Sequence, residues 1–295
     1  IQDKLATSAI LTYTLDSTCY SVIGKQTEAI NELDKNDPEY YVKQGNTTEQ
    51  YIAENSIVKV YGSEAAEELI DHCFQIYGGY GFIEEYPMAQ AYRDNRINKI
   101  WEGTNEINRM LCGRAMITKA LSGEIGFKEY LEKVDVYCNN GLDSGYEGDL
   151  KTEVECVEAA KAVYAICLNE SLSKHGQDIG TEQVIIENLA NILIYAYVGD
   201  STLSRVIQNK DLYVQKNQVV PELCAKVYTA EQGIRVMEYA NKILNSIYDG
   251  EIPKELESKF AKLSKRLSLS TDTIGLKKII GEKVVEAGGY PVQSF

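Results

Sequence analysis

The chain has 295 residues, of which 44% are hydrophobic and 25% are charged, and its formal net charge is −14. This length allows about two domains with a substantial core, and the composition is that of ordinary soluble globular proteins. The negative charge and the lack of a basic patch in the sequence argue against binding to nucleic acid or to an anionic membrane.

The first 46 residues divide into a helical part and a polar part. Apolar residues recur every three or four positions from Leu5 to Val22, which predicts a first helix that ends near Gly24. The stretch 25–46 is rich in Lys, Asn, Asp and Glu and contains Pro38. We therefore expect this stretch to form a loop with at most a short helical turn.

A second, longer helix is predicted from the following residues. Thr47 and Gln50 have the spacing of a capping box, and helical periodicity then continues to Ile76. Such a helix is about 45 Å long at the standard rise per residue. The pair Gly78 and Gly79 reads as its C-cap, where the backbone turns through positive φ.

The stretch Gln75–Arg109 reads QIYGGYGFIEEYPMAQAYRDNRINKIWEGTNEINR. It combines the glycine pair, a dense run of aromatic and charged residues, and a lone carboxylate, Glu102, in front of a third predicted helix from near Gly103 to Leu121. The first N–H groups of a helix have no partner within it. This helix start therefore predicts an anion or phosphate site beside Glu102.

The second half of the chain is predicted to be helical throughout. A short helix over 127–136 is followed by the linker NNGLDSGYEG at 139–148. Further helices are expected over 151–174, 181–198, 200–214, 217–248, 253–267 and 273–287. Since no alternating strand pattern occurs, the predicted fold class is all-α. The predicted domains are a helical-bundle part over 1–124, a short helix and linker over 125–148, and an accessory helical domain over 149–295.

The motifs in Gln75–Arg109 resemble the C-terminal signature of the flavin-dependent acyl-CoA dehydrogenases, where QI-x-GG-x-GF, EYP, YRD and EGT-x-EI-x-R follow in this order. The resemblance begins with IQDKLA at Ile1 and covers roughly residues 1–122. The extra helical region resembles that of very-long-chain-type members. We therefore expect the chain to be the C-terminal part of a longer protein, inactive as a fragment.

The resemblance implies a role for each residue of the signature. Glu102 matches the EGT glutamate that removes the α proton of an acyl-CoA thioester while the β hydrogen leaves as hydride to flavin N5. Trp101 and Gly103 match substrate-binding positions. The residues at positions that match FAD-binding segments are Gln75, Ile76, Tyr77, Gly78, Gly79, Thr104, Asn105 and Glu106.

Each of these assignments has a structural alternative. A glutamate before a helix is usually an N-terminal carboxylate favoured by the helix dipole. A glycine pair is most often a plain C-cap, and a lone tryptophan such as Trp101 is often a core side chain. His72 and His175 have no second imidazole at metal-ligand spacing, so no metal site is expected. The seven cysteines contain no CxxC pair and are expected to be free thiols.

The expected partners also follow from the resemblance. They are FAD as cofactor, acyl-CoA as substrate and an electron-transferring flavoprotein as electron acceptor, in fatty acid β-oxidation. A flavin shared between subunits implies a homo-oligomer, either a dimer or a tetramer. No targeting leader can be read, so a cytoplasmic protein is expected, and the acidic charge argues against membrane association. The alternative is a non-catalytic assembly or interaction protein that retains the dehydrogenase fold.

Overall fold

The computed structural model describes residues 1–292, and within this range every regular element is a helix, which confirms the all-α prediction. The elements of the first part are α1 (Gln2–Asn31), α2 (Tyr40–Gln50), α3 (Ile52–Tyr77), α4 (Gly79–Phe82), α5 (Pro87–Arg96), η1 (Ile97–Lys99) and α6 (Asn105–Ser122). Those of the second part are α7 (Phe127–Asn140), α8 (Lys151–His175), η2 (Gly176–Thr181), α9 (Gln183–Gln208), α10 (Lys210–Gln215), α11 (Val220–Ile247), α12 (Lys254–Leu267) and α13 (Thr273–Ala287).

The connection between the first two long helices differs from the prediction. Helix α1 continues past Gly24 to Asn31, and part of the expected loop forms α2, which has no buried residue. The predicted capping box is wrong, because Thr47 lies inside α2 and its hydroxyl donates to the Lys43 carbonyl at 2.9 Å. A threonine within a helix commonly donates a hydrogen bond to a carbonyl of the preceding turn in this way. The spacing between Thr47 and Gln50 therefore does not mark the start of a helix.

The predicted break between residues 198 and 200 is absent, because α9 runs without interruption through Gly199. A Cβ at this glycine would lie 2.9 Å from Cγ2 of Val157 on α8. The glycine therefore permits a close approach of two helices rather than ending one of them. Helices α8, α9 and α11 each have 14 buried residues, so these three helices together form the centre of the second half.

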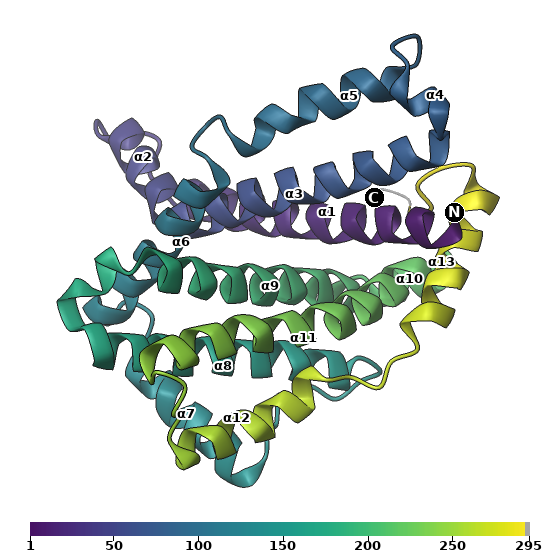
Figure 1. The fold of residues 1–295 in the computed structure, drawn as a ribbon. Coiled ribbons are helices and arrows are strands. Elements are labelled where there is room, and N and C mark those ends of the chain that lie inside the picture. The colour runs from purple at the N-terminus through teal and green to yellow at the C-terminus, as the bar shows by residue number, and fades with distance from the viewer. Residues whose placement is uncertain (293–295) are drawn as a thin grey trace.

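The helices form layers around α9 (Figure 1). Helices α1 and α3 lie on one side of α9, with α5 outermost, and α8 and α11 lie on the other side with α7 and α12 beyond them. Helix α13 returns to pack on α1 near the N-terminus. The start of α1 and helix α13 therefore lie together at one side of the bundle.

The core is shared between the two halves of the chain. One buried cluster contains Tyr13 of α1, Ile57 of α3, Val198 of α9, Tyr228 of α11 and Ile280 of α13. Residues before and after the expected linker thus bury their apolar side chains in one common cluster. The boundaries at 124 and 149 remain a prediction.

Within residues 1–292, no helix is both long enough and apolar enough to cross a bilayer. In the same range no group of three or more His, Cys, Asp or Glu side chains is arranged to hold a metal ion. All seven cysteines are free thiols, and five of them are buried. Burial raises the pKa of the Cys112 thiol to about 12.

Glu153, in the first turn of α8, is a buried carboxyl group whose pKa is raised above its ordinary value, chiefly by burial. When the pH rises above the ordinary pKa of a glutamate, the carboxyl group loses its proton in the unfolded chain before it does so in the folded chain. Glu153 therefore lowers the free energy of unfolding progressively as the pH rises. We expect Glu153→Gln to stabilise the protein more at pH 7 than at pH 4, measured by thermal unfolding. The matched control is Glu155→Gln, since Glu155 is equally buried but paired with Arg266 at 2.8 Å; it should destabilise at pH 7. Equal gains for Glu153→Gln at both pH values would contradict this account.

Candidate functional site

The turn between η1 and α6 carries Glu102 and has an unusual backbone. Glu102 has φ of 54° and Gly103 has φ of 78°, so two consecutive residues are left-handed. Such a conformation is unfavourable for a glutamate and persists only where the surroundings enforce it. Thr104 then caps α6, because its hydroxyl oxygen accepts a hydrogen bond from the backbone N–H of Ile107 at 3.3 Å.

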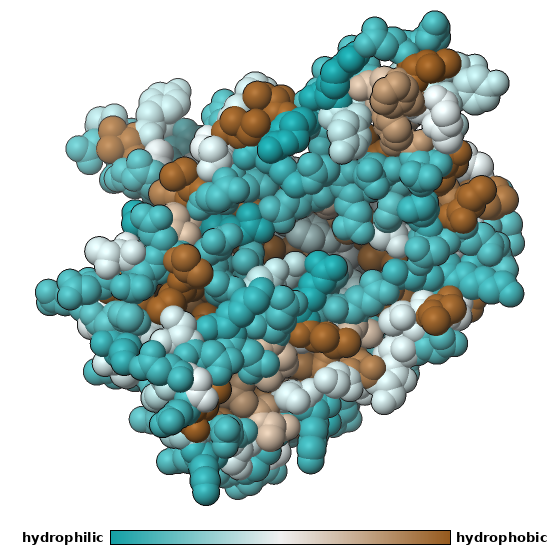
Figure 2. All heavy atoms as spheres, in the orientation of Figure 1, coloured by the Kyte–Doolittle hydropathy of each residue, from teal (hydrophilic) through white to brown (hydrophobic). Residues whose placement is uncertain are grey.

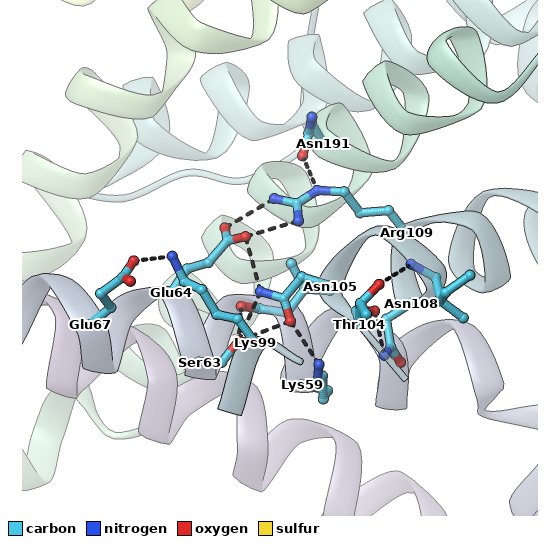
Figure 3. Close-up of polar contacts among 12 residues, drawn as sticks. Lys59, Ser63, Glu64, Glu67, Lys99, Thr104, Asn105, Asn108, Arg109 and Asn191 are labelled. Carbon is cyan, nitrogen blue, oxygen red and sulfur yellow. Dashed lines mark hydrogen bonds and ion pairs between the residues drawn. The ribbon is translucent and has the colours of Figure 1, made fainter. Parts of the chain in front are cut away.

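The turn is held by side chains from α3 and α6 (Figure 3). The Lys59 ammonium of α3 donates to the Gly103 carbonyl at 2.6 Å and to Asn105 Oδ1 at 2.8 Å. The Asn108 amide of α6 donates to the carbonyls of Gly103 at 2.9 Å and Thr104 at 3.1 Å. Helix α3 therefore fixes both the turn and the first residue of α6.

Asn105 points into the protein and is only 3% exposed. Besides Lys59, its side chain contacts the Ser63 hydroxyl at 2.9 Å and Glu64 Oε1 at 3.1 Å (Figure 3). Since both the oxygen and the nitrogen of this amide already have partners, contact with a cofactor would fall to the Asn105 backbone. The cofactor role of Asn105 remains a prediction.

An ion pair connects the same site to α9 (Figure 3). The Arg109 guanidinium binds both oxygens of Glu64, at 2.9 and 3.0 Å, and its Nε donates to Asn191 Oδ1 at 2.7 Å. A bidentate pair of this kind holds both side chains in a defined orientation. Lys99 and Glu67 form a second pair between η1 and α3.

We expect Arg109→Met to destabilise the protein by about 2 kcal/mol, because Glu64 loses its partner. The expected loss of stability is smaller than for a fully buried ion pair, since the Glu64 side chain is 38% exposed and therefore partly solvated. Urea unfolding of Arg109→Met, Glu64→Gln and the double variant would measure the coupling between the two side chains. Strict additivity of the two single effects would show that the pair contributes nothing.

The side chains that the signature assigns to chemistry are exposed in this chain. Glu102 is exposed, and Trp101 is 55% exposed with its indole N–H donating to Asn98 Oδ1 at 3.2 Å. Trp101 is therefore not a core side chain here. No element among residues 1–292 covers Glu102, so the water-poor surroundings expected for a base do not come from this chain.

The N-terminus of α6 already has an anionic partner from its own first turn. The pKa of Glu106 is lowered by a hydrogen bond from its own backbone N–H, by the Thr104 hydroxyl, and by the charges of Arg109 and Lys59. The carboxylate is thus stabilised at the positive end of the helix, where an external anion would otherwise bind.

The second predicted group, Gln75–Gly79, lies at the other end of α3. Gly78 has φ of 59° and its N–H donates to the Gln75 carbonyl at 3.2 Å, so the pair does end the helix as expected. The residues from Ser63 to Gly78 span about 22 Å at the helical rise per residue. Hence the chain does not bring this group together with Glu102.

The sequence patterns did not identify four polar residues of the site, namely Lys59, Ser63, Glu64 and Asn191. Lys59 and Ser63 are four residues apart on α3, so they share one helix face beside the apolar stripe. This polar break in an otherwise apolar face could have identified Lys59 and Ser63 as residues of a site. No sequence pattern could have identified Asn191 in this way, because its partner Arg109 is distant in sequence.

A groove of about 630 Å³ lies beside the site, between α2, the start of α3 and α6. It is lined by Tyr41, Gln44, Gly45, Thr48, Glu49, Ile52, Asn55, Ser56, Asn108 and Leu111. Asn108 thus contributes to the groove wall and also holds the turn. Glu102 does not line the groove.

Two family models match the chain, and both describe the C-terminal domain of acyl-CoA dehydrogenases. The first matches residues 1–117 and the second matches residues 159–259. A probable acyl-CoA dehydrogenase of Bacillus subtilis is 28% identical over 292 residues, which is 99% of this chain and 49% of the relative. The mitochondrial very long-chain specific acyl-CoA dehydrogenase of Homo sapiens is 30% identical over 70% of this chain and 32% of its own length.

The comparison with solved structures also finds acyl-CoA dehydrogenases. An acyl-CoA dehydrogenase complexed with FAD from Bacillus anthracis superposes with a TM-score of 0.89 at 28% identity, over 99% of this chain and 49% of that one. Acyl-CoA oxidase3 of Yarrowia lipolytica, at 16% identity and a TM-score of 0.59 over 98% of this chain and 44% of that one, shares the fold. The chain spans about half the length of the two Bacillus proteins. By its motifs, its fold and these matches, the chain belongs to the acyl-CoA dehydrogenase family.

Proposed function

We propose that the chain is the C-terminal helical part of an FAD-dependent acyl-CoA dehydrogenase, which removes the α and β hydrogens of an acyl-CoA thioester. The observation that carries this proposal is the fixed left-handed turn that presents Glu102 in front of α6. An exposed carboxylate with no function would require neither a strained backbone nor the hydrogen bonds that hold the carbonyls next to it. The family motifs on both sides of the turn support the same reading.

In this proposal Glu102 is the base that takes the α proton. The α C–H of a thioester is a weak acid, so the carboxylate must act with little competing water, where its basicity is greater. Because Glu102 is exposed in this chain, the water-poor site has to be completed by substrate, cofactor and further protein. Trp101 and Gly103 flank the base and are proposed to contact the substrate.

Open space beside the glycine pair supports the proposed contact with FAD. Nothing lies within 4 Å of a Cβ built at Gly78 or at Gly79, so a ligand can approach this backbone closely. Gln75, Ile76 and Tyr77 precede the pair, and Thr104 to Glu106 form the second contact region. Bound FAD would supply the acceptor for the hydride that leaves the β carbon.

The separation of about 22 Å between the two regions supports contacts to two different parts of the cofactor, or to cofactors of two subunits. We therefore propose a homodimer or homotetramer. An electron-transferring flavoprotein as acceptor, a place in fatty acid β-oxidation and a cytoplasmic location are further parts of the proposal.

The test is the visible absorbance of the complete enzyme. The purified protein should be yellow, and a saturated acyl-CoA added without oxygen should bleach its flavin band. A colourless protein, or a flavin that no acyl-CoA reduces, would reject the proposal. In that case the non-catalytic assembly protein with a dehydrogenase fold would be favoured.

A further inference from the structure

The Gly103 carbonyl is the point where the turn is held most firmly. It accepts two hydrogen bonds, one from the Lys59 ammonium at 2.6 Å and one from the Asn108 amide at 2.9 Å. The first donor comes from α3 and the second from the first turn of α6, so two different helices hold the carbonyl. Asn108 also reaches the Glu102 carbonyl at 3.4 Å.

These contacts fix the backbone of the turn and therefore the direction in which the Glu102 side chain leaves it. The direction of a side chain follows from the φ and ψ of its own residue, and Glu102 sits in a conformation that a glutamate leaves readily. If the Gly103 carbonyl were released, the turn could relax and the carboxylate would swing with it. A displacement of about 1 Å in a reacting group can cost about a hundredfold in rate.

Lys59 is suited to this task by its surroundings. Its ammonium is partly buried and both of its bonded partners are neutral oxygens, Gly103 O and Asn105 Oδ1. Burial lowers the pKa of Lys59, while the charges of Glu106 and Glu64 act in the opposite direction. A hydrogen bond from a charged donor to a neutral carbonyl is stronger than one between neutral groups.

We propose that Lys59 and Asn108 are positioning residues, which hold the Gly103 carbonyl and thereby keep Glu102 in the orientation needed for proton removal. The inference rests on the proposed function of Glu102. Neither residue touches the reacting atoms in this role.

Amide hydrogen exchange of the complete enzyme tests whether Lys59 and Asn108 hold the turn. Lys59→Met removes the cation, Asn108→Asp replaces the donor by an acceptor at nearly constant size, and Lys59→Arg keeps a cationic donor. We expect Lys59→Met and Asn108→Asp to speed exchange of the amides around Ile107 and Asn108 at least about tenfold, because each substitution removes a donor that makes more than one hydrogen bond at the turn. Lys59→Arg should recover most of the protection.

Lys119→Met is the matched control, because Lys119 of α6 also donates to a backbone carbonyl, that of Gln50, at 2.8 Å. It removes the same kind of bond at the far end of α6. Exchange around Ile107 and turnover should both remain at the parental level in this variant. Exchange that accelerates equally in Lys119→Met and Lys59→Met would overturn the inference.

Turnover distinguishes this inference from the proposed function. Lys59→Met should lower kcat at least about tenfold with little change in KM, since binding is retained while orientation is lost. If Glu102→Gln abolishes turnover but Lys59→Met leaves kcat and exchange unchanged, the positioning role is wrong and the function stands. If Glu102→Gln keeps parental turnover, both the function and the positioning of a base are wrong.

Discussion

Glu102→Gln in the complete enzyme is expected to lower turnover by at least about a hundredfold, the contribution usual for a general base. Glutamine keeps the size of the side chain and can still hydrogen bond, but it cannot accept the α proton. Because the turn is held through backbone carbonyls by Lys59 and Asn108, the substitution should leave the fold and the flavin content unchanged. The loss should therefore appear in kcat.

Solvent exchange of the substrate provides a second measurement of the same group. In deuterated water the parental enzyme should introduce deuterium at the α carbon, and Glu102→Gln should not. Glu129→Gln serves as the control, since Glu129 is likewise an exposed glutamate near a helix start and a left-handed glycine, Gly126, but belongs to α7. Near-parental turnover of Glu102→Gln would mean that another residue is the base.

Gly113→Ala is expected to destabilise the protein by about 2 kcal/mol, although alanine favours a helix over glycine. A Cβ at Gly113 of α6 would lie 2.4 Å from Cγ2 of Ile186 on α9 and 3.2 Å from the carbonyl oxygen of the same residue. Ile186 is fully buried and cannot move aside. The two helices must therefore separate, and contacts of the shared core are lost.

Gly24→Ala is the matched control, because Gly24 also lies within a helix but nothing lies within 4 Å of its added Cβ. This substitution should stabilise by about 0.5 to 1 kcal/mol, through the lower chain entropy of the unfolded state. Thermal or urea unfolding would compare the two variants. If Gly113→Ala stabilised as much as Gly24→Ala, the close packing of α6 on α9 would be disproved.

The contrast between these two glycines shows where sequence patterns stop being informative. Both are single glycines in a helical pattern, but the apolar periodicity continues past Gly113 and stops at Gly24. The helix ended near neither of them, and Gly199 likewise marked a close helix contact rather than a break. Whether a glycine ends a helix or admits a neighbour depends on what packs there, which is not a local property.

The sequence by itself determined the helical fold class, the order of the long helices and the family motifs around Glu102. Apolar periodicity and short motifs are local, so they can be read without knowing the partners of a helix. Only the tertiary structure decided that α2 is a helix, that α9 is continuous, and that α1, α9 and α13 share one core.

The tertiary structure also decided the surroundings of Glu102. The bonds from Lys59 to Gly103 and from Arg109 to Asn191 join residues that are 44 and 82 positions apart. No spacing rule relates such residues, because their distance in space is set by how α3, α6 and α9 pack. The residue types at the site are thus encoded locally, whereas the geometry that orients them arises from packing between distant helices.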